Sequence, residues 1–106
     1  MAVLAVDGGN SKTDLALVSR AGALLALVRG PTISHQQVTM KAAMTRLADL
    51  AEEAHRQAGT DGVAELGSYC LAGADFPSDL RSLKRAIGAR GLASKSIVRN
   101  DAHAAL

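Results

Sequence analysis

Three short apolar runs within the first thirty residues limit the folds that the chain can adopt. They cover Ala2 to Val6, Leu15 to Val18 and Ala23 to Val28, and glycine-containing turns stand between them. Short apolar runs bounded by turn residues are typical of strands. Because short glycine-containing loops join strands into hairpins, the sequence predicts three sequential antiparallel strands.

The rest of the chain alternates between helix and strand patterns. Apolar residues recur every three or four positions from Gln36 to Ala58, and a helix-start pattern begins at Pro77. Strands are predicted at Leu66 to Ala72 and at Ser96 to Val98, with a further helix opening at Asn100. This order predicts an α/β domain in which helices flank a mixed sheet. We expect its first and last strands to be neighbours in the parallel part.

Length and charge narrow the classes of protein. The 106 residues fit one domain, 1–106, at the low end of roughly 100–200 residues per domain. The net charge is +2, and the charged residues are scattered, so we expect no nucleic-acid or membrane partner. Cys70 is the sole cysteine, which excludes an internal disulfide. There is no signal-peptide pattern and no run of the roughly 20 apolar residues that cross a bilayer, so we expect a cytoplasmic protein.

A polar turn follows the first predicted strand. Glycine lets a backbone turn tightly, and free amide groups there can approach an anion. Hydroxyl groups and an ammonium group add hydrogen-bond donors for phosphate, and a carboxylate at the end of a strand can hold Mg²⁺. The candidate phosphate-binding residues are Gly8, Gly9, Asn10, Ser11, Lys12 and Thr13, and the candidate metal ligand is Asp7. The alternative is an ordinary polar hairpin turn, and the spacing is not that of a Walker sequence.

A second polar group, Asn100 and Asp101, follows the last predicted strand. Parallel strands end at the same edge of a sheet, so Asp7 and Asp101 are expected at one edge. A carboxylate there can accept the proton of a substrate hydroxyl as that hydroxyl attacks a phosphoryl group. The alternative is that one of these residues caps a helix.

Other polar or small residues give weaker indications of a binding edge. Gly73 follows the fourth predicted strand, where a small residue lets a ligand approach. The segment after the third strand contains Ser34 and His35, and His35 alone fits a loop residue or a helix cap. His55 is predicted to lie on a helix surface.

Four ordered segments resemble one known family. VDGGNSKTDLALV, RGPTISHQQV, CLAGADFPSD and IVRNDAHAAL are similar to segments of the BadF/BadG/BcrA/BcrD ATPase family, which includes N-acetylglucosamine kinase. The resemblance implies the actin-like ATPase fold, in which two ribonuclease H-like domains close over ATP and Mg²⁺. It covers the first, N-terminal domain of such a sugar kinase, so the second, C-terminal lobe is absent from the 106 residues.

The resemblance also implies roles for individual residues. The glycine-rich turn would contact the ATP phosphates, with Asp7 near the metal, and Asp101 would be the base that activates the sugar hydroxyl. Ser34, His35 and Asn100 would contact the sugar. Family members commonly carry an asparagine where this chain has Ile33 and Ser34, so the preferred sugar stays open. We expect the isolated chain to be inactive, because the adenine pocket of this fold lies in the other lobe.

Three alternatives remain at this point. One is a glucokinase-like kinase of the ROK family, which also has a glycine-rich first turn. Another branch of the BadF-type family carries an iron–sulfur cluster, for which Cys70 alone gives poor support. The third is a non-catalytic module that binds a nucleotide or a sugar, or that pairs with another chain. An exposed sheet edge would also allow a homodimer.

Overall fold

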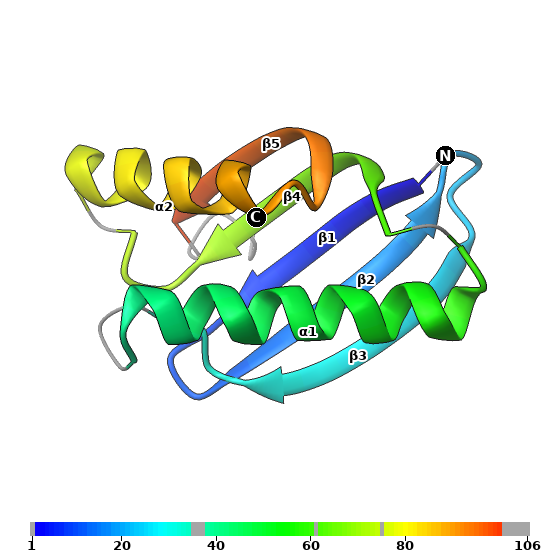
Figure 1. Cartoon of the computed structure of the whole chain (residues 1–106), viewed down its shortest axis with the longest axis horizontal. Coiled ribbons are helices and arrows are strands. Elements are labelled where there is room, and N and C mark those ends of the chain that lie inside the picture. The colour runs from blue at the N-terminus through cyan, green and yellow to red at the C-terminus, as the bar shows by residue number, and fades with distance from the viewer. Residues whose placement is uncertain (1, 35–37, 61, 75, 101–106) are drawn as a thin grey trace.

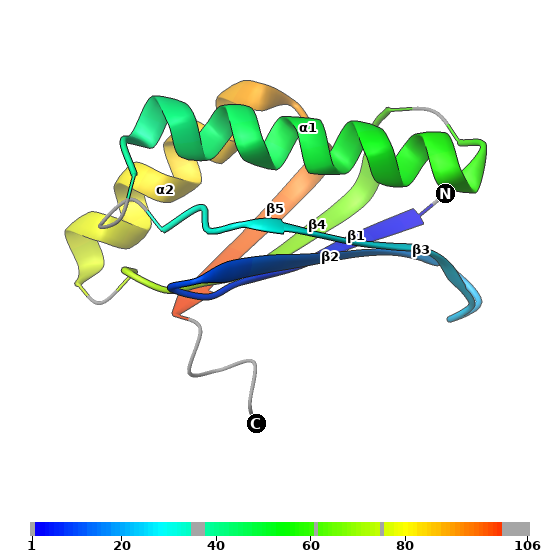
Figure 2. The ribbon, with the colours of Figure 1, turned by 90° about the horizontal axis from the view of Figure 1, so that it is seen from below.

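A computed structural model describes residues 2–34, 38–60, 62–74 and 76–100 of the chain. It contains a five-stranded sheet in the order β3-β2-β1-β4-β5 (Figure 1). The elements are β1 (Ala2–Gly8), β2 (Lys12–Ser19), β3 (Leu24–Pro31), α1 (Met40–Ala58), β4 (Ala64–Leu71), α2 (Pro77–Arg90) and β5 (Ala93–Asn100). Figure 2 shows both helices on the same side of the sheet.

The sheet is mixed, as the sequence predicted. β1, β2 and β3 form an antiparallel unit, whereas β4 is parallel to β1 and β5 is parallel to β4. The prediction that the first and last strands are neighbours is wrong, because β4 lies between β1 and β5. A parallel connection needs a crossover, and the crossover through α1 brings β4 beside β1. The carboxyl ends of β1 and β5 still lie at one edge.

Each helix begins and ends with a recognisable local interaction. The Thr39 side chain accepts a hydrogen bond from the Ala42 amide at 3.1 Å, and α1 ends at Gly59, whose φ is 69°. The Asp79 carboxylate accepts from the Phe76 amide at 3.1 Å at the start of α2, which ends at Gly91 with φ 63°. Such caps satisfy backbone groups that the helix leaves unpaired, and glycine adopts positive φ without strain. α1 therefore ends at the predicted Ala58 but begins four residues after the predicted Gln36, and α2 begins at the predicted Pro77.

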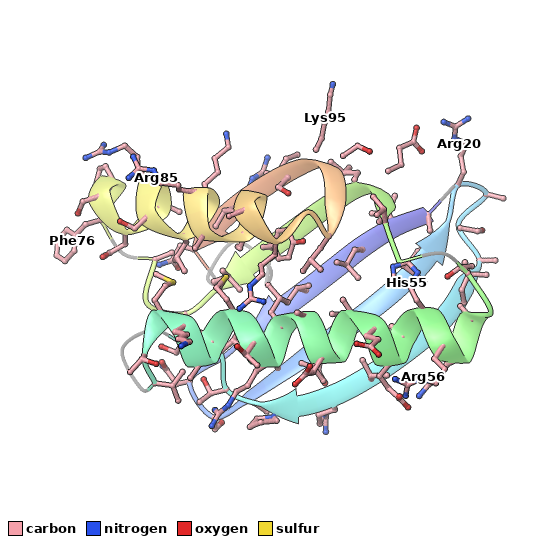
Figure 3. All side chains as sticks on the ribbon, viewed as in Figure 1. Arg20, His55, Arg56, Phe76, Arg85 and Lys95 are labelled. Atoms are coloured by element: carbon pink, nitrogen blue, oxygen red, sulfur yellow. The ribbon has the colours of Figure 1, made fainter. Side chains whose placement is uncertain are left out.

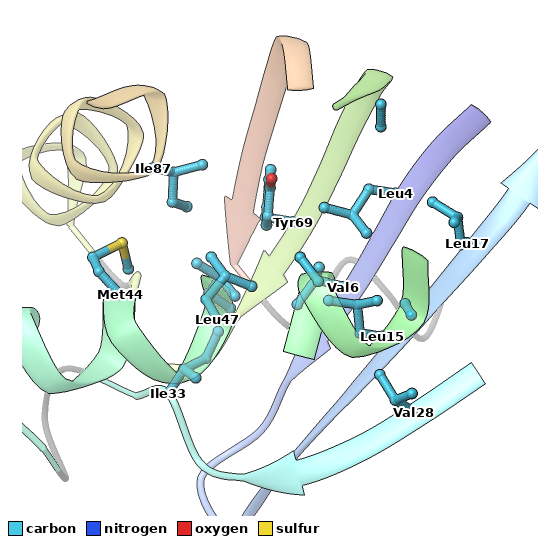
Figure 4. Close-up of a cluster of buried hydrophobic side chains, with 14 of the residues drawn as sticks. Leu4, Val6, Leu15, Leu17, Val28, Ile33, Met44, Leu47, Tyr69 and Ile87 are labelled. Carbon is cyan, nitrogen blue, oxygen red and sulfur yellow. The ribbon is translucent and has the colours of Figure 1, made fainter. Parts of the chain in front are cut away.

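The helix-covered face of the sheet carries the core (Figure 4). Leu4, Leu15, Leu17 and Tyr69 have no exposed surface, and Leu47 of α1 packs among them. Other buried members of this cluster are Val6, Val28, Ile33, Met44, Leu83 and Ile87. Burying one such side chain contributes about 1.5–3 kcal/mol. Every second side chain of the strands therefore packs on this face and holds the helices against the sheet.

The opposite, open face carries the other half of each strand and has no described helix over it (Figure 2). Leu24, Leu27 and Ile97 are 62%, 59% and 41% exposed there. Neither α1 nor α2 is long and apolar enough to cross a membrane, and these are the helices of the described part of the chain.

Candidate functional site

The carboxyl ends of β1, β4 and β5 form one edge of the sheet. The strand register places Gly8, Leu71 and Asn100 level with one another at this edge. One residue earlier, Asp7, Cys70 and Arg99 are level. Successive side chains of a strand point to opposite faces, so these three belong to the open face. Residues from three strands therefore meet at the predicted edge.

The turn between β1 and β2 is closed by its own backbone. The Gly9 amide donates a hydrogen bond to the Lys12 carbonyl at 2.9 Å, so this amide is not available to a phosphate. Gly8 is buried, and a Cβ atom there would lie only 2.8 Å from Leu71 Cδ2. Asn10, Ser11 and Lys12 are exposed. The part of the turn that a ligand can reach is therefore its tip.

Thr13 is buried, although the sequence grouped it with the phosphate-binding residues. Its hydroxyl donates to the Pro31 carbonyl at 2.9 Å and joins the start of β2 to the end of β3. This hydrogen bond occupies the hydroxyl and stabilises the base of the turn between β1 and β2. Direct contact between Thr13 and a phosphate stays a prediction that this geometry does not favour.

A second set of hydrogen bonds joins the segment after β3 to the same turn. The Thr32 hydroxyl donates to the Gly9 carbonyl at 2.8 Å and accepts from the Ser34 amide at 3.0 Å. Arg46 of α1 donates from Nη1 to the Thr32 carbonyl at 2.8 Å. Sequence reasoning missed Thr32 and Arg46, because nothing in the local pattern indicates a contact between residues 23 or 14 positions apart.

Of the candidate sugar-binding residues in this segment, the structure describes Ser34 but not His35. Ser34 is 2% exposed, and its hydroxyl has no hydrogen-bond partner among the described residues. Because the hydroxyl is buried, it presents no surface to a ligand in the described structure, and its contact with a sugar stays a prediction. His35 lies outside the described residues, as does Asp101, the predicted base. Their roles stay predictions.

Asn100 and the turn after β4 are in direct contact. The Asn100 side chain donates from Nδ2 to the Ala74 carbonyl at 3.2 Å. Gly73 has φ +90°, a backbone conformation that residues other than glycine rarely adopt. The hydrogen bond thus brings two of the predicted substrate-binding positions, Gly73 and Asn100, to the same corner of the edge.

Two carboxylates face each other across β1 and β2. Asp7 and Asp14 are register partners, and Asp14 is bound by Arg29 of β3, with 2.6 Å between Nε and Oδ1. The hydrogen bond from Arg29 lowers the pKa of the Asp14 carboxyl, a shift that partial burial opposes. Asp7 is exposed and forms no ion pair within the described ranges. Beside this pair is a hollow of about 260 Å³ whose lining includes Ala5, Ala16 and Ser68.

These features test whether a magnesium ion fits. Mg²⁺ prefers oxygen ligands and is commonly held by one or two carboxylates together with substrate phosphates. Asp7 is an uncommitted carboxylate beside a turn that can meet phosphates, so it fits such an ion. The described residues contain no group of three or more histidine, cysteine or acidic side chains that could hold a metal by themselves.

His55 lies away from this edge, at the last turn of α1 (Figure 3). The prediction that His55 lies on the helix surface is wrong, because the residue is 5% exposed. Its Nδ1 atom is 2.7 Å from the Thr60 hydroxyl oxygen. The chain bends back after Gly59 and covers the imidazole, which an isolated helix would leave exposed.

Comparisons with known proteins add evidence on the fold. No family model matches the chain, and no curated protein matches it. The chain is similar to the crystal structure of a candidate N-acetylglucosamine kinase from Chromobacterium violaceum, with 18% identity and a TM-score of 0.70. The match covers 93% of this chain and 34% of that chain. The chain therefore has the fold of about one third of that structure.

A weaker likeness links the chain to a PilM-PilN type IV pilus biogenesis complex. Its TM-score is 0.44 at 16% identity, and it covers 98% of this chain and 39% of that chain.

Proposed function

We propose that the chain is the first ribonuclease H-like domain of an actin-like ATPase of the BadF type, and that the complete protein phosphorylates an amino sugar such as N-acetylglucosamine. ATP would be the phosphate donor, which fits a cytoplasmic location. The likeness to the candidate kinase supports the fold. The observation that carries the proposal is the meeting of the Asn10–Lys12 tip, Asp7 and Asn100 at one edge of the sheet.

In this proposal the turn tip and Asp7 bind the nucleotide. Exposed amide and hydroxyl groups of Asn10 and Ser11 and the Lys12 ammonium would donate to phosphate oxygens. Asp7 would hold the Mg²⁺ of Mg·ATP, which neutralises phosphate charge during phosphoryl transfer. Thr13 and Thr32 would hold the turn in place through their hydrogen bonds to Pro31 and Gly9.

The sugar would lie beside the turn, between the segment after β3 and the end of β5. Ser34 and His35 would contact it from one side, and Asn100 from the other, where Asn100 is held against Ala74. Asp101 would take the proton of the attacking hydroxyl, because a carboxylate within hydrogen-bond reach of that group is a suitable general base.

The chain spans about a third of the matched kinase chain, so the activity of the 106 residues alone is a separate question from that of the complete protein. A second lobe would supply the adenine pocket and a second phosphate-binding turn. We therefore expect negligible turnover from the 106 residues by themselves. The second candidate function is a non-catalytic module that binds nucleotide or sugar.

The first test replaces the proposed base in the complete protein. Asp101→Asn keeps the size of the side chain but removes its basicity, and general-base catalysis contributes roughly 10²–10⁴-fold to a rate. We expect turnover to fall by that factor while calorimetry still detects sugar binding. Asp49→Asn, at an exposed position of α1, is the matched control and should leave turnover unchanged.

Two results would contradict the proposal. Unchanged turnover in Asp101→Asn would leave that residue without a catalytic role. Absence of ATP-dependent sugar phosphorylation by the unmodified complete protein would favour the binding-module alternative.

A further inference from the structure

The charged residues near the carboxyl edge of the open face fall into two groups. Asp14 and Arg29 neutralise each other through two hydrogen bonds, of 2.6 Å and 3.4 Å. Asp7, Lys12 and Arg99 are exposed and form no ion pair with any described residue. Exposed charges without partners at the edge of a sheet are available to a charged ligand.

The strand register fixes where Arg99 lies relative to the candidate nucleotide site. Arg99 is opposite Cys70, which is opposite Asp7, so the three form one row across β5, β4 and β1. Neighbouring strands are about 4.8 Å apart, which separates the Arg99 and Asp7 backbones by roughly 10 Å. Val98, the residue before Arg99, packs against the core on the covered face. The Arg99 side chain therefore belongs to the open face, as Asp7 does.

Lys12 lies on the other side of Asp7. It begins β2, two residues before Asp14, the register partner of Asp7. Two uncommitted cations thus stand on either side of an uncommitted carboxylate. A chain of phosphate groups that carries a magnesium ion has the complementary pattern, because its metal needs an anionic ligand and its free oxygens need cationic donors.

We propose that Arg99 is a phosphate-binding residue whose guanidinium binds the oxygens at one end of a polyphosphate that lies over Asp7, with Lys12 at the other end. The inference rests on the proposed function, since it supplies a further contact for the same nucleotide. A guanidinium presents a planar set of donors that can bind two phosphate oxygens at once, whereas an ammonium acts as a point charge. Arg99 would therefore orient the phosphate group as well as attract it.

Lys95 provides a matched control on the same strand and the same face. It is exposed and lies four residues before Arg99, which is roughly 13 Å along a strand. Figure 3 shows the Lys95 side chain projecting away from the sheet. Replacing Lys95 by a neutral residue changes the net charge by the same amount as replacing Arg99. It leaves the charge at the carboxyl edge of the sheet unchanged.

The experiment measures binding of inorganic tripolyphosphate, with and without Mg²⁺, to the 106-residue chain by NMR titration and calorimetry. Arg99→Gln should weaken binding by about 10-fold to 100-fold, the usual value of a charge-assisted hydrogen bond. Lys95→Gln should weaken it by less than about 2-fold. Arg99→Lys should give an intermediate affinity, because it keeps the charge and loses the planar donors. Dispersed amide spectra establish that each variant is folded.

Several outcomes would overturn the inference. Equal losses in Arg99→Gln and Lys95→Gln would indicate general electrostatic attraction, and full affinity in Arg99→Gln would exclude the contact. Failure of the unmodified chain to bind tripolyphosphate would also exclude it for this chain. Arg99-dependent binding in a complete protein that phosphorylates no sugar would refute the proposed function and leave this site standing. Sugar phosphorylation with no effect of Arg99→Gln on nucleotide binding or turnover would do the reverse.

Discussion

The two faces of the sheet are built from the same strands and differ in what they hold. At one level of the sheet, Val6 and Tyr69 point to the covered face and are buried. One residue further, Asp7 and Cys70 belong to the open face, where Asp7 is exposed and Cys70 is half-buried. A shift of one residue along a strand exchanges these faces. The alternation thus separates the residues that stabilise the fold from those available for chemistry.

Tyr69 shows how closely packed the covered face is. Its ring lies across Gly67, where a Cβ atom would be 2.6 Å from Tyr69 Cε2. Burial raises the pKa of the Tyr69 hydroxyl to about 12, and the Ser96 side chain acts in the opposite direction. The contact with Ser96 falls short of a well-formed hydrogen bond, and no other described group bonds the hydroxyl. The residue therefore contributes mainly through the packing of its ring.

The largest effect is expected where this packing is removed. Tyr69→Ala should lower the free energy of unfolding by about 3–5 kcal/mol, as truncation of a buried aromatic residue usually does. Urea unfolding followed by circular dichroism measures the change. Tyr69→Phe is the control and should stay within about 1 kcal/mol of the unmodified chain, because it keeps the ring. If both variants lost similar stability, the hydroxyl and not the ring would be the important group.

A matched pair of substitutions compares the faces directly. Ala26 is 6% exposed beneath α1, and its β2 neighbour Leu17 is fully buried, whereas Ala16 borders the 260 Å³ hollow of the open face. Ala26→Leu should destabilise the chain by about 1–3 kcal/mol through overpacking. Ala16→Leu should change stability by no more than about 0.5 kcal/mol. Equal costs, measured by the same unfolding experiment, would mean that the open face is packed as tightly as the covered one.

Most of the fold could be predicted because each element carries its own local pattern. β1 and β2 contain short apolar runs, α1 has helical periodicity, and Gly59 and Gly91 stand directly after the two helices. These signals depend on nearby residues only. β5 was predicted too short, because exposed Ser94, Lys95 and Arg99 interrupt its apolar pattern. The order of the parallel strands was wrong because it depends on which strand the crossover places beside β1, and no local pattern encodes that choice.

The candidate site could be predicted only in part, for a related reason. The glycine-rich turn and Asn100 are visible as polar groups that follow strands. Which of their atoms are free is decided by contacts distant in sequence. The Gly9 carbonyl is engaged with the Thr32 hydroxyl, and the Thr13 hydroxyl is engaged with Pro31. The free charge of Arg99 likewise becomes evident only when the register places it level with Asp7.

The smallest expected effect concerns the neutralised pair on the open face. Arg29 holds the pKa of the Asp14 carboxyl below its ordinary value of 3.8 through a hydrogen bond. A carboxyl whose pKa is lower in the folded state stabilises the fold above the ordinary pKa, and this contribution disappears as the pH falls through the folded pKa. Arg29→Gln should therefore raise the pKa of Asp14 toward 3.8, which carboxyl-carbon NMR measures directly.

The same variant separates a surface pair from a core interaction. Because the Arg29 side chain is 65% exposed, salt should screen the attraction. The stability difference between the unmodified chain and Arg29→Gln should be small at neutral pH, shrink in high salt and vanish below the Asp14 pKa. A difference that persisted in acid would show that Arg29 stabilises the sheet by packing its aliphatic stem on the open face. The contrast between the two faces would then be one of degree, with apolar contacts contributing on both.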